Sequence, residues 1–289
     1  MKERFITKNF HDSSLAIIDD ANDIIAEYQA QGFSLTLRQL FYQFVARDLI
    51  PNTTRSYDRL GTIINDGRMA GLIDWLSIED RTRERKRNSH WDNPKGVIES
   101  ARDSYGIDMW SNQPYRVEVW IEKEALVGVI EHTCRALDVP FFACRGYVSQ
   151  SEQWRAGVEF RNPDQHIVIL HLGDHDPSGI DMTRDNFARL RMFSDDNVTV
   201  ERIALNMDQI KKYNPPPNPA KVTDSRYETY LLAYGPESWE LDALEPKTLT
   251  DLIIEKVINH RDDILYAERE RQLANDMTKL DKIITNLKT

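Results

Sequence analysis

From residue 116 to residue 205, short apolar runs alternate with segments of helical period, and this alternation limits the possible folds more than any other feature. The runs predict strands and the segments between them predict helices. The expected strands are RVEVWI (116–121), VPFFACRG (139–146), HIVILHLG (166–173) and VTVERIAL (198–205), and the expected helices are ALVGVIEHTCRAL (125–137), SEQWRAGVEF (151–160) and SGIDMTRDNFARLRMF (178–193). Such an order favours an α/β fold with a mostly parallel sheet, whose functional groups lie at the carboxyl ends of the strands.

The N-terminal part of the chain has a different pattern. Apolar positions at helical spacing predict helices over residues 13–30, 34–51 and 54–71. The alternating segment LIDWLSIED, residues 72–80, is a candidate strand. Short helices followed by a strand and a basic loop resemble a winged helix, a variant of the helix-turn-helix DNA reader.

The two patterns meet where periodicity breaks, between Ser89 and Pro114. The sequence therefore predicts two domains, a winged-helix domain with an N-terminal helix at residues 1–110 and an α/β domain at residues 111–289. Residues 239–287 predict two charged helices that extend the second domain, and the last of them could be either a pairing surface or an exposed cap.

Composition points to an ordinary water-soluble chain. No run in the 289 residues approaches the roughly 20 apolar residues that a membrane-spanning helix needs. The N-terminus has no apolar run and cleavage site of a secretory signal, so we expect no membrane partner and a cytoplasmic location. Cys134 and Cys144 lack the spacing of a disulfide framework or a zinc site, which fits a reducing compartment.

Charge is distributed unevenly along the chain. A formal net charge of -10 argues against a generic nucleic-acid coat protein. A basic run, RTRERKRN, could nevertheless contact phosphates, although a solvated loop is the alternative. The DNA contacts that we predict are Arg55, Arg59, Arg81, Arg83, Arg85, Lys86, Arg87 and Arg145.

Three carboxylates follow two of the expected strands. Glu122 ends the first strand, and Asp174 and Asp176 follow the strand at 166–173 in the sequence GDHDPSG. If these strands are neighbours, the three side chains meet at one edge of the sheet, and hard oxygen ligands of this kind suit Mg2+. A solvated turn or a helix N-cap is the alternative for the two aspartates. His175 is expected to be a loop residue, and Glu124 to cap the following helix.

A tyrosine and an arginine share one flank of the second expected helix. In TLRQLFY, residues 36–42, Arg38 and Tyr42 lie one turn apart beside the apolar stripe. An arginine at that position could bind a scissile phosphate and favour the phenolate of a tyrosine nucleophile. The alternative is a half-buried structural tyrosine.

Taken in order, Thr-x-Arg-x-Leu-Phe-Tyr, V-x-I-E-K-E-A and D-x-D-P-x-G resemble the A subunit of topoisomerase VI and its meiotic double-strand-break relatives, over roughly residues 34–245. The segment RIALNMDQIKKYNPPPNPAK is also similar. The resemblance, to a compact kind found on phages and mobile elements, implies a winged-helix domain followed by a Toprim domain. It implies that Tyr42 is the nucleophile, that Arg38 and Glu122 are catalytic, and that Glu122, Asp174 and Asp176 hold Mg2+. It also implies a homodimer in which the tyrosine of one subunit works with the metal site of the other.

The chain departs from that family in two respects. Its segment ACRGYVSQS keeps Arg145 and Gly146 but lacks the family's Pro-Asp. Nothing in it resembles the GHKL ATPase subunit that topoisomerase VI needs, so we expect no strand passage by this chain alone and regard a separate ATPase subunit as a possible partner. The alternatives are a Toprim nuclease that uses metal-activated water and a non-catalytic DNA-binding module.

Overall fold

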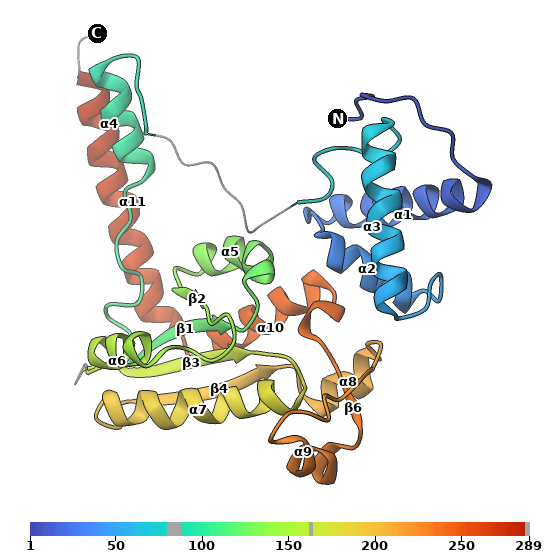
Figure 1. Ribbon diagram of the computed structural model, residues 1–289. Coiled ribbons are helices and arrows are strands. Elements are labelled where there is room, and N and C mark those ends of the chain that lie inside the picture. The colour runs from blue at the N-terminus through green and yellow to red at the C-terminus, as the bar shows by residue number, and fades with distance from the viewer. Residues whose placement is uncertain (80–87, 162–163, 287–289) are drawn as a thin grey trace.

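The computed structural model describes residues 1–79, 88–161 and 164–286, which form an N-terminal helical body and an α/β body with one parallel sheet (Figure 1). The helices are α1 (Asp12–Ala30), α2 (Leu37–Ala46), α3 (Thr54–Met69), α4 (Pro94–Asp103), α5 (Val127–Ala136), α6 (Gln150–Glu159), α7 (Pro177–Phe193), α8 (Met207–Tyr213), α9 (Tyr227–Tyr234), α10 (Pro246–Asn259) and α11 (Asp263–Asn286). The strands are β1 (Tyr115–Ile121), β2 (Phe141–Ala143), β3 (His166–Leu172), β4 (Val198–Ala204), β5 (Asn218–Pro219) and β6 (Glu237–Ser238), and two short 3-10 turns are η1 (Glu124–Leu126) and η2 (Leu241–Ala243).

The central sheet has the order β2-β1-β3-β4, and all of its neighbouring strands are parallel. On one face, Val119 of β1 and Leu170 of β3 share a core with α5 and α10. On the other face, Trp120 and Ile169 share a core with α6 and α7. Burial on both faces explains the continuous apolar runs of the sequence and confirms the predicted α/β fold with a parallel sheet.

The N-terminal body packs α1, α2 and α3 around a core of its own. All three helices were expected, and a capping box at Thr36 fixes the start of α2. The strand predicted over residues 72–80 is wrong in its described part, since it makes only an isolated bridge between Leu35 and Ile78. Asp74 bends the segment by accepting a hydrogen bond from Leu76 N (2.7 Å), and Leu76 is 75% exposed. A winged helix is therefore not confirmed.

A long excursion after β4 brings a distant segment back to the sheet. Helix α8, the β5-β6 pair and α9 lead to Trp239, whose backbone exchanges two hydrogen bonds with His175 (2.8 and 2.9 Å). The following turn, η2, packs against α2, and Ala243 belongs to the core of the N-terminal body. Residues 239–243 therefore lie between the carboxyl edge of the sheet and the helical body.

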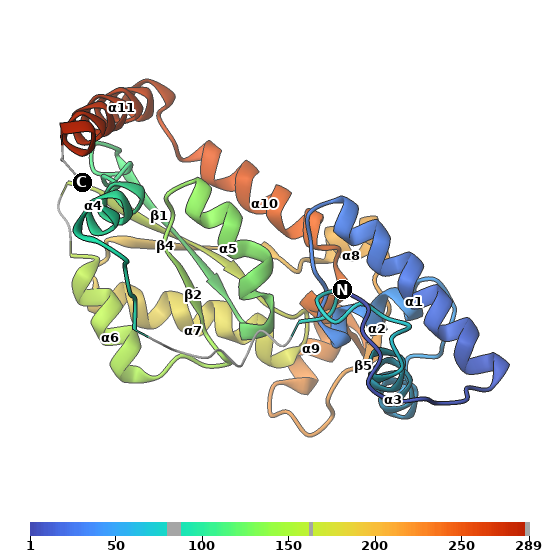
Figure 2. The ribbon, with the colours of Figure 1, turned by 90° about the horizontal axis from the view of Figure 1, so that it is seen from above.

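At the opposite end of the molecule from α1–α3, α4 and α11 pair (Figure 2), and they project away from the sheet as an arm (Figure 1). Arg102 binds Asp281 (2.9 Å) and the Tyr105 hydroxyl donates to Asp276 (3.2 Å), and α11 buries only Tyr266. Helix α4 thus contacts the α/β body although it precedes residue 110. None of the helices in the described residues is long and apolar enough to traverse a lipid bilayer.

Candidate active site

The carboxyl ends of β1 and β3 hold the predicted carboxylates. These strands are paired in register as far as Ile121 and Leu172, so the residues after them are neighbours. Glu122 N donates to Leu172 O (2.8 Å), and the Glu122 carboxylate accepts a hydrogen bond from Asp174 N (2.8 Å). Two segments that are far apart in the sequence therefore place Glu122 beside the Gly173–Asp176 loop, as the strand order predicts.

Asp176 also caps a helix. Its Oδ1 accepts hydrogen bonds from Gly179 N (2.6 Å) and from the Ser178 hydroxyl (3.0 Å), which satisfies the first turn of α7. Asp176 is therefore a helix N-cap, which is the alternative that the sequence offered for the two aspartates. Capping occupies Oδ1, and Oδ2 makes no hydrogen bond or ion pair with the described residues.

Burial and mutual repulsion oppose ionisation of these groups. Burial is the main cause that raises the pKa of Asp174 to about 7, with the carboxylates of Glu122 and Asp242 adding to it and Lys123 opposing it. Burial likewise raises the pKa of Glu122, and Asp176 adds to the effect. An added cation would relieve this repulsion.

Lys123 is a half-buried cation that the sequence interpretation missed. Its Nζ lies 3.0 Å from Asp174 Oδ1, 2.8 Å from Glu240 Oε2 and 2.5 Å from Asp242 Oδ1. Burial opposes its charge, but the three carboxylates outweigh burial and raise its pKa. Its place directly after Glu122 is the only sequence signal that could have marked it.

Glu240 and Asp242 complete the cluster and were also not predicted. Asp242 is 3% exposed, and Leu241 N between them donates to Asp174 Oδ1 (2.7 Å). Burial would raise the pKa of Glu240, but Lys123 and Arg38 outweigh it and lower the pKa. In the sequence these residues look like an ordinary polar segment before a helix. Only the bridge between His175 and Trp239 brings them to the site.

Arg38 and Tyr42 reach the same cluster from the N-terminal body. Arg38 forms ion pairs with Glu240 and with Asp242 (Nε to Oδ2, 3.1 Å), and its guanidinium carbon lies 5.9 Å from the centre of the Tyr42 ring. Burial, followed by the Glu240 carboxylate, raises the pKa of Tyr42 to about 12, while Arg38 opposes the shift. The expected proximity of Arg38 and Tyr42 is present, and the tyrosine is 4% exposed.

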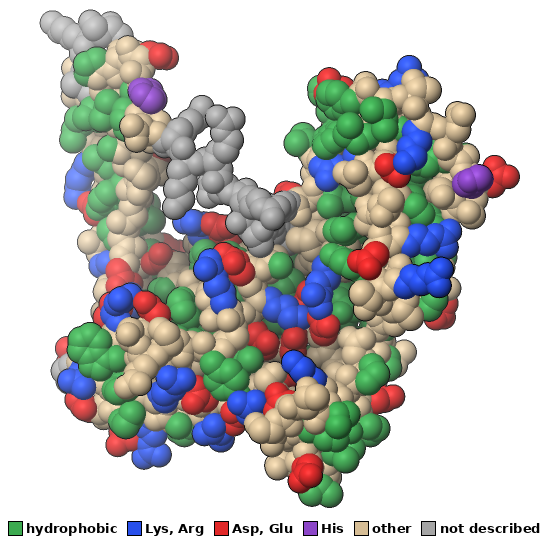
Figure 3. All heavy atoms as spheres, in the orientation of Figure 1, with side chains coloured by type: hydrophobic (Ala, Val, Ile, Leu, Met, Phe, Trp, Pro, Cys, Tyr) green, Lys and Arg blue, Asp and Glu red, His purple; other side chains and the backbone are tan. Residues whose placement is uncertain are grey.

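One cavity of about 700 Å3 joins the two sets of residues. Arg38 and Tyr42 line it from α2, and Asp174 and Asp176 line it from the sheet edge. Its other walls include Tyr57, Lys221 and Glu240. Figure 3 shows acidic and basic side chains gathered at this junction between the helical body and the α/β body.

Arg202 of β4 binds the backbone of the acidic loop, Gly173–Asp176, and of the first turn of α7. Its guanidinium donates to the carbonyl oxygens of Gly173 (2.9 Å), Asp174 (2.6 Å) and Gly179 (2.9 Å). His175 was expected to be a loop residue and does lie in the loop, but it is buried against aromatic rings, with its Nδ1 2.7 Å from the Tyr230 hydroxyl. Both side chains therefore fix the backbone that carries Asp174 and Asp176.

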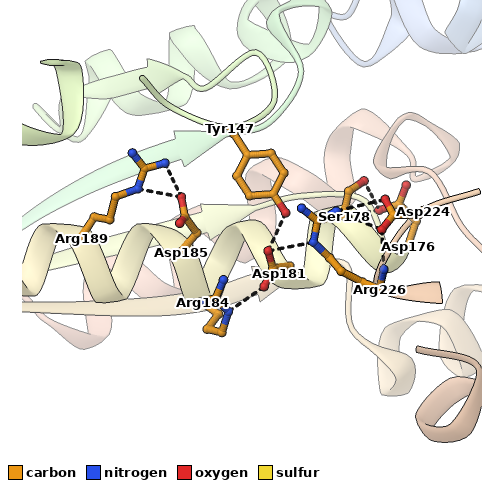
Figure 4. A network of polar contacts seen from close by, with 10 residues as sticks. Tyr147, Asp176, Ser178, Asp181, Arg184, Asp185, Arg189, Asp224 and Arg226 are labelled. Atoms are coloured by element: carbon orange, nitrogen blue, oxygen red, sulfur yellow. Dashed lines mark hydrogen bonds and ion pairs between the residues drawn. The ribbon is translucent and has the colours of Figure 1, made fainter. Parts of the chain in front are cut away.

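A second polar network covers the outer side of α7 (Figure 4). The Tyr147 hydroxyl donates to Asp181 (2.6 Å), which also binds Arg184 (2.6 Å) and Arg226 (3.0 Å). Figure 4 shows this network next to Ser178 and Asp176. It anchors the first turns of α7, and with them the capping aspartate.

Three carboxylates of the chemical kind that binds a cation lie at this edge of the sheet, but they do not form a closed cage. Among residues 1–79, 88–161 and 164–286, no three His, Cys, Asp or Glu side chains are arranged as a ready metal site. Glu122, Asp174 and Asp176 nevertheless each keep one oxygen that bonds to none of the described residues. Mg2+ commonly takes only one or two carboxylates together with water and phosphate, so this donor set suits it.

The predicted DNA contacts are spread over several places. Arg55 and Arg59 are exposed on α3, and Arg145 is exposed after β2, where it forms an ion pair with Glu124 at the start of η1. The basic residues at 81, 83, 85, 86 and 87 lie outside the described residues. Arg55 and Arg59 are thus the described candidates that lie on the helical body.

Comparison with known proteins assigns no family to this arrangement. No protein-family model matches the chain, and no curated protein is significantly similar to it in sequence. The residues of the site itself are therefore the basis for a function.

Proposed function

We propose that this chain cleaves DNA by transesterification, with Tyr42 as the nucleophile, in the manner of the topoisomerase VI A subunit. One observation carries the proposal: Arg38 and Tyr42 line the same cavity as Asp174 and Asp176. A tyrosine, a phosphate-binding cation and acidic ligands for a divalent ion are the groups that this reaction requires.

In the proposed reaction, a bond forms between Tyr42 Oη and phosphorus while the bond from phosphorus to the 3' oxygen breaks. The products are a 5' phosphotyrosine and a free 3' hydroxyl. Arg38 binds the scissile phosphate and orients it. Because the pKa of Tyr42 is raised to about 12, its hydroxyl is protonated at neutral pH; it loses this proton as the new bond forms, and the leaving 3' oxygen gains one to become the 3' hydroxyl.

The acidic residues have a supporting role in this proposal. Glu122, Asp174 and Asp176 would hold Mg2+, which when bound supplies Lewis-acid stabilisation of charge on the phosphoryl oxygens. Asp176 keeps the loop in place through its cap on α7, and Arg202 does so through the loop carbonyls. Glu122 couples β1 to the loop by accepting from Asp174 N.

The proposals on domains, partners and location rest on the resemblance to the topoisomerase VI A subunit. We propose that the helical body is a reduced winged helix that contacts DNA and that the α/β body is a Toprim domain. We further propose a homodimer in the cytoplasm, which would need a separate GHKL ATPase subunit for strand passage. The acidic net charge of -10 makes local basic residues such as Arg55 and Arg59 the proposed contacts with the duplex.

The decisive experiment looks for protein covalently attached to broken DNA. Supercoiled plasmid is incubated with the protein and Mg2+, the reaction is stopped with detergent, and half of it is treated with proteinase. We expect broken DNA that enters a gel normally only after proteinase treatment. Tyr42→Phe should abolish the adduct, whereas Tyr57→Phe, which alters another tyrosine lining the cavity, should retain it.

A metal-dependent nuclease is the second candidate, and the burial of Tyr42 favours it. A tyrosine that is 4% exposed and whose hydroxyl has a raised pKa fits a structural residue beside a site where water attacks. Cleavage by Tyr42→Phe at the wild-type rate, without any adduct, would establish this candidate instead. Absence of cleavage with either Mg2+ or Mn2+ would leave a DNA-binding module.

A further inference from the structure

We infer that the α/β body has a second binding site, a cavity between α7, β4, α8 and α9 that binds one nucleotide, with the base against Phe187 and the phosphate on Arg184. This inference goes beyond the proposed function and does not depend on it. All the residues that line the cavity lie between positions 175 and 234, within the α/β body.

The cavity is distinct from the one that Tyr42 lines. Its volume is about 550 Å3, which is in the range of small-molecule sites. His175 lines it, whereas Asp174 and Asp176 line the cavity at Tyr42. Successive side chains of an extended segment point in opposite directions, so the acidic loop separates the two cavities. A ligand here would contact the loop on the side away from its carboxylates.

The charge of the lining favours an anion. Arg184 and Arg202 line the cavity, and among the described residues no aspartate or glutamate does so. The cavity at Tyr42 has the opposite character, because Asp174 and Asp176 are in its walls. In a chain with a net charge of -10, a cavity lined by arginines suits an anionic group and not a metal ion.

Arg184 has free donors for a phosphate. Its Nε binds Asp181 (2.6 Å), and its two terminal nitrogens make no hydrogen bond or ion pair with the described residues. Figure 4 shows this arginine on the outer side of α7, and its side chain is 66% exposed. A guanidinium with free N–H groups suits bidentate binding of a phosphate. Arg202 contributes only its charge, because its N–H groups bind the Thr183 hydroxyl and backbone carbonyls.

Two aromatic rings provide surfaces for a base. Phe187 follows Arg184 by three residues on α7, Tyr234 ends α9, and both rings line the cavity and are 38% exposed. The Tyr234 ring is held by an edge contact with the His175 ring (4.7 Å between centroids). Among the described residues, the Asn206 amide uses one N–H, on a backbone carbonyl (3.0 Å), which leaves its second N–H for a base edge. Exposed aromatic rings beside a cation are typical of sites for unpaired nucleotides.

Calorimetry without any divalent metal tests this site whether or not the protein cleaves DNA. Deoxyadenosine monophosphate should bind, and deoxyadenosine and deoxyribose 5-phosphate should each bind at least about 10-fold more weakly, because each lacks one of the two recognised groups. An affinity for deoxyribose 5-phosphate equal to that for the nucleotide would overturn the role of the rings.

Two substitutions identify the cavity. Arg184→Gln and Phe187→Leu should each weaken binding of the nucleotide by about 5- to 100-fold, and neither removes a buried side chain. Arg155→Gln is the matched control and should keep the wild-type affinity. Arg155 also binds a carboxylate three residues earlier in its helix, Glu152 (2.7 Å), but it does not line the cavity.

The nucleotide could be a free one or an unpaired nucleotide of a DNA strand, and a single strand of about eight nucleotides distinguishes these sources. Tighter binding of the strand than of the mononucleotide, with the same loss in both variants, assigns the site to DNA. Binding of the mononucleotide that is at least as tight assigns it to a free nucleotide.

Hydrogen exchange locates the bound nucleotide. Deoxyadenosine monophosphate should slow exchange in α7 and in residues 200–207, and leave α2 unchanged. Slower exchange confined to α2 would place the nucleotide at the cavity of Tyr42 and overturn the inference. Absence of binding by either probe, or affinities that Arg184→Gln and Phe187→Leu leave unchanged, would overturn it as well.

Discussion

Gly179 illustrates how tightly single residues are constrained around the acidic loop. A Cβ at this position would lie 2.2 Å from the carbonyl oxygen of Asp174 and 3.2 Å from Asp176 Oδ1. Backbone cannot yield as a flexible side chain does, so the first turn of α7 can approach the loop this closely only with glycine. The same contact brings Gly179 N to the capping oxygen of Asp176 (2.6 Å).

Gly179→Ala should therefore destabilise the protein and displace the loop. We expect a loss of about 1–3 kcal/mol in the free energy of unfolding, as for other insertions of a methyl group into packed space. Gly96→Ala in α4 is the matched control, because its Cβ would meet atoms only at 3.7 Å or more. That control should be neutral or stabilising, and urea unfolding of both variants measures the difference. Equal effects of the two substitutions would contradict the close approach.

At the scale of elements, the sequence predicts best what is decided locally. Strands such as β3 are buried on both faces, so their apolar runs are unambiguous, and the strand-end positions of Glu122 and Asp174 follow directly. The segment at 72–80 was misassigned because its alternation concealed the turn at Asp74. Glu240 could not be foreseen, since only tertiary packing through the His175–Trp239 bridge brings it to the site.

Helix α2 depends on its cap, and the cap can be tested. The Thr36 hydroxyl accepts from Gln39 N (3.2 Å), and Gln39 Oε1 accepts from Thr36 N (2.9 Å). Thr36→Ala should lower the free energy of unfolding by about 0.5–2 kcal/mol, because the Gln39 N–H in the first turn loses its acceptor. Thr36→Ser should keep most of the stability. Chemical denaturation distinguishes the two, and an alanine variant as stable as the serine variant would show that the box contributes nothing.

At the scale of the whole molecule, the placement of charge decides how a polyanion could approach. The chain carries a net charge of -10, and two cations of the site, Arg38 and Lys123, are already paired with carboxylates. The overall electrostatic field of the protein would thus attract a DNA duplex little. Binding would depend on local basic residues and on Arg38 exchanging its carboxylate partners for a phosphate. Arg55 and Arg59 are exposed on α3, whose first residue, Thr54, lines the cavity.

If α3 faces DNA, substitution of both arginines by glutamine should weaken binding and make it less sensitive to salt. Each lost phosphate contact lowers the slope of log K against log salt by about 0.9, so the double variant should lose about 1.8 from the slope. Arg135→Gln is the control, because this exposed residue of α5 forms an ion pair with Glu131 and does not line the cavity. Fluorescence anisotropy with a labelled duplex at several salt concentrations measures the slopes. An unchanged slope in the double variant would remove α3 from the DNA interface while leaving the chemistry proposed for Tyr42 untouched.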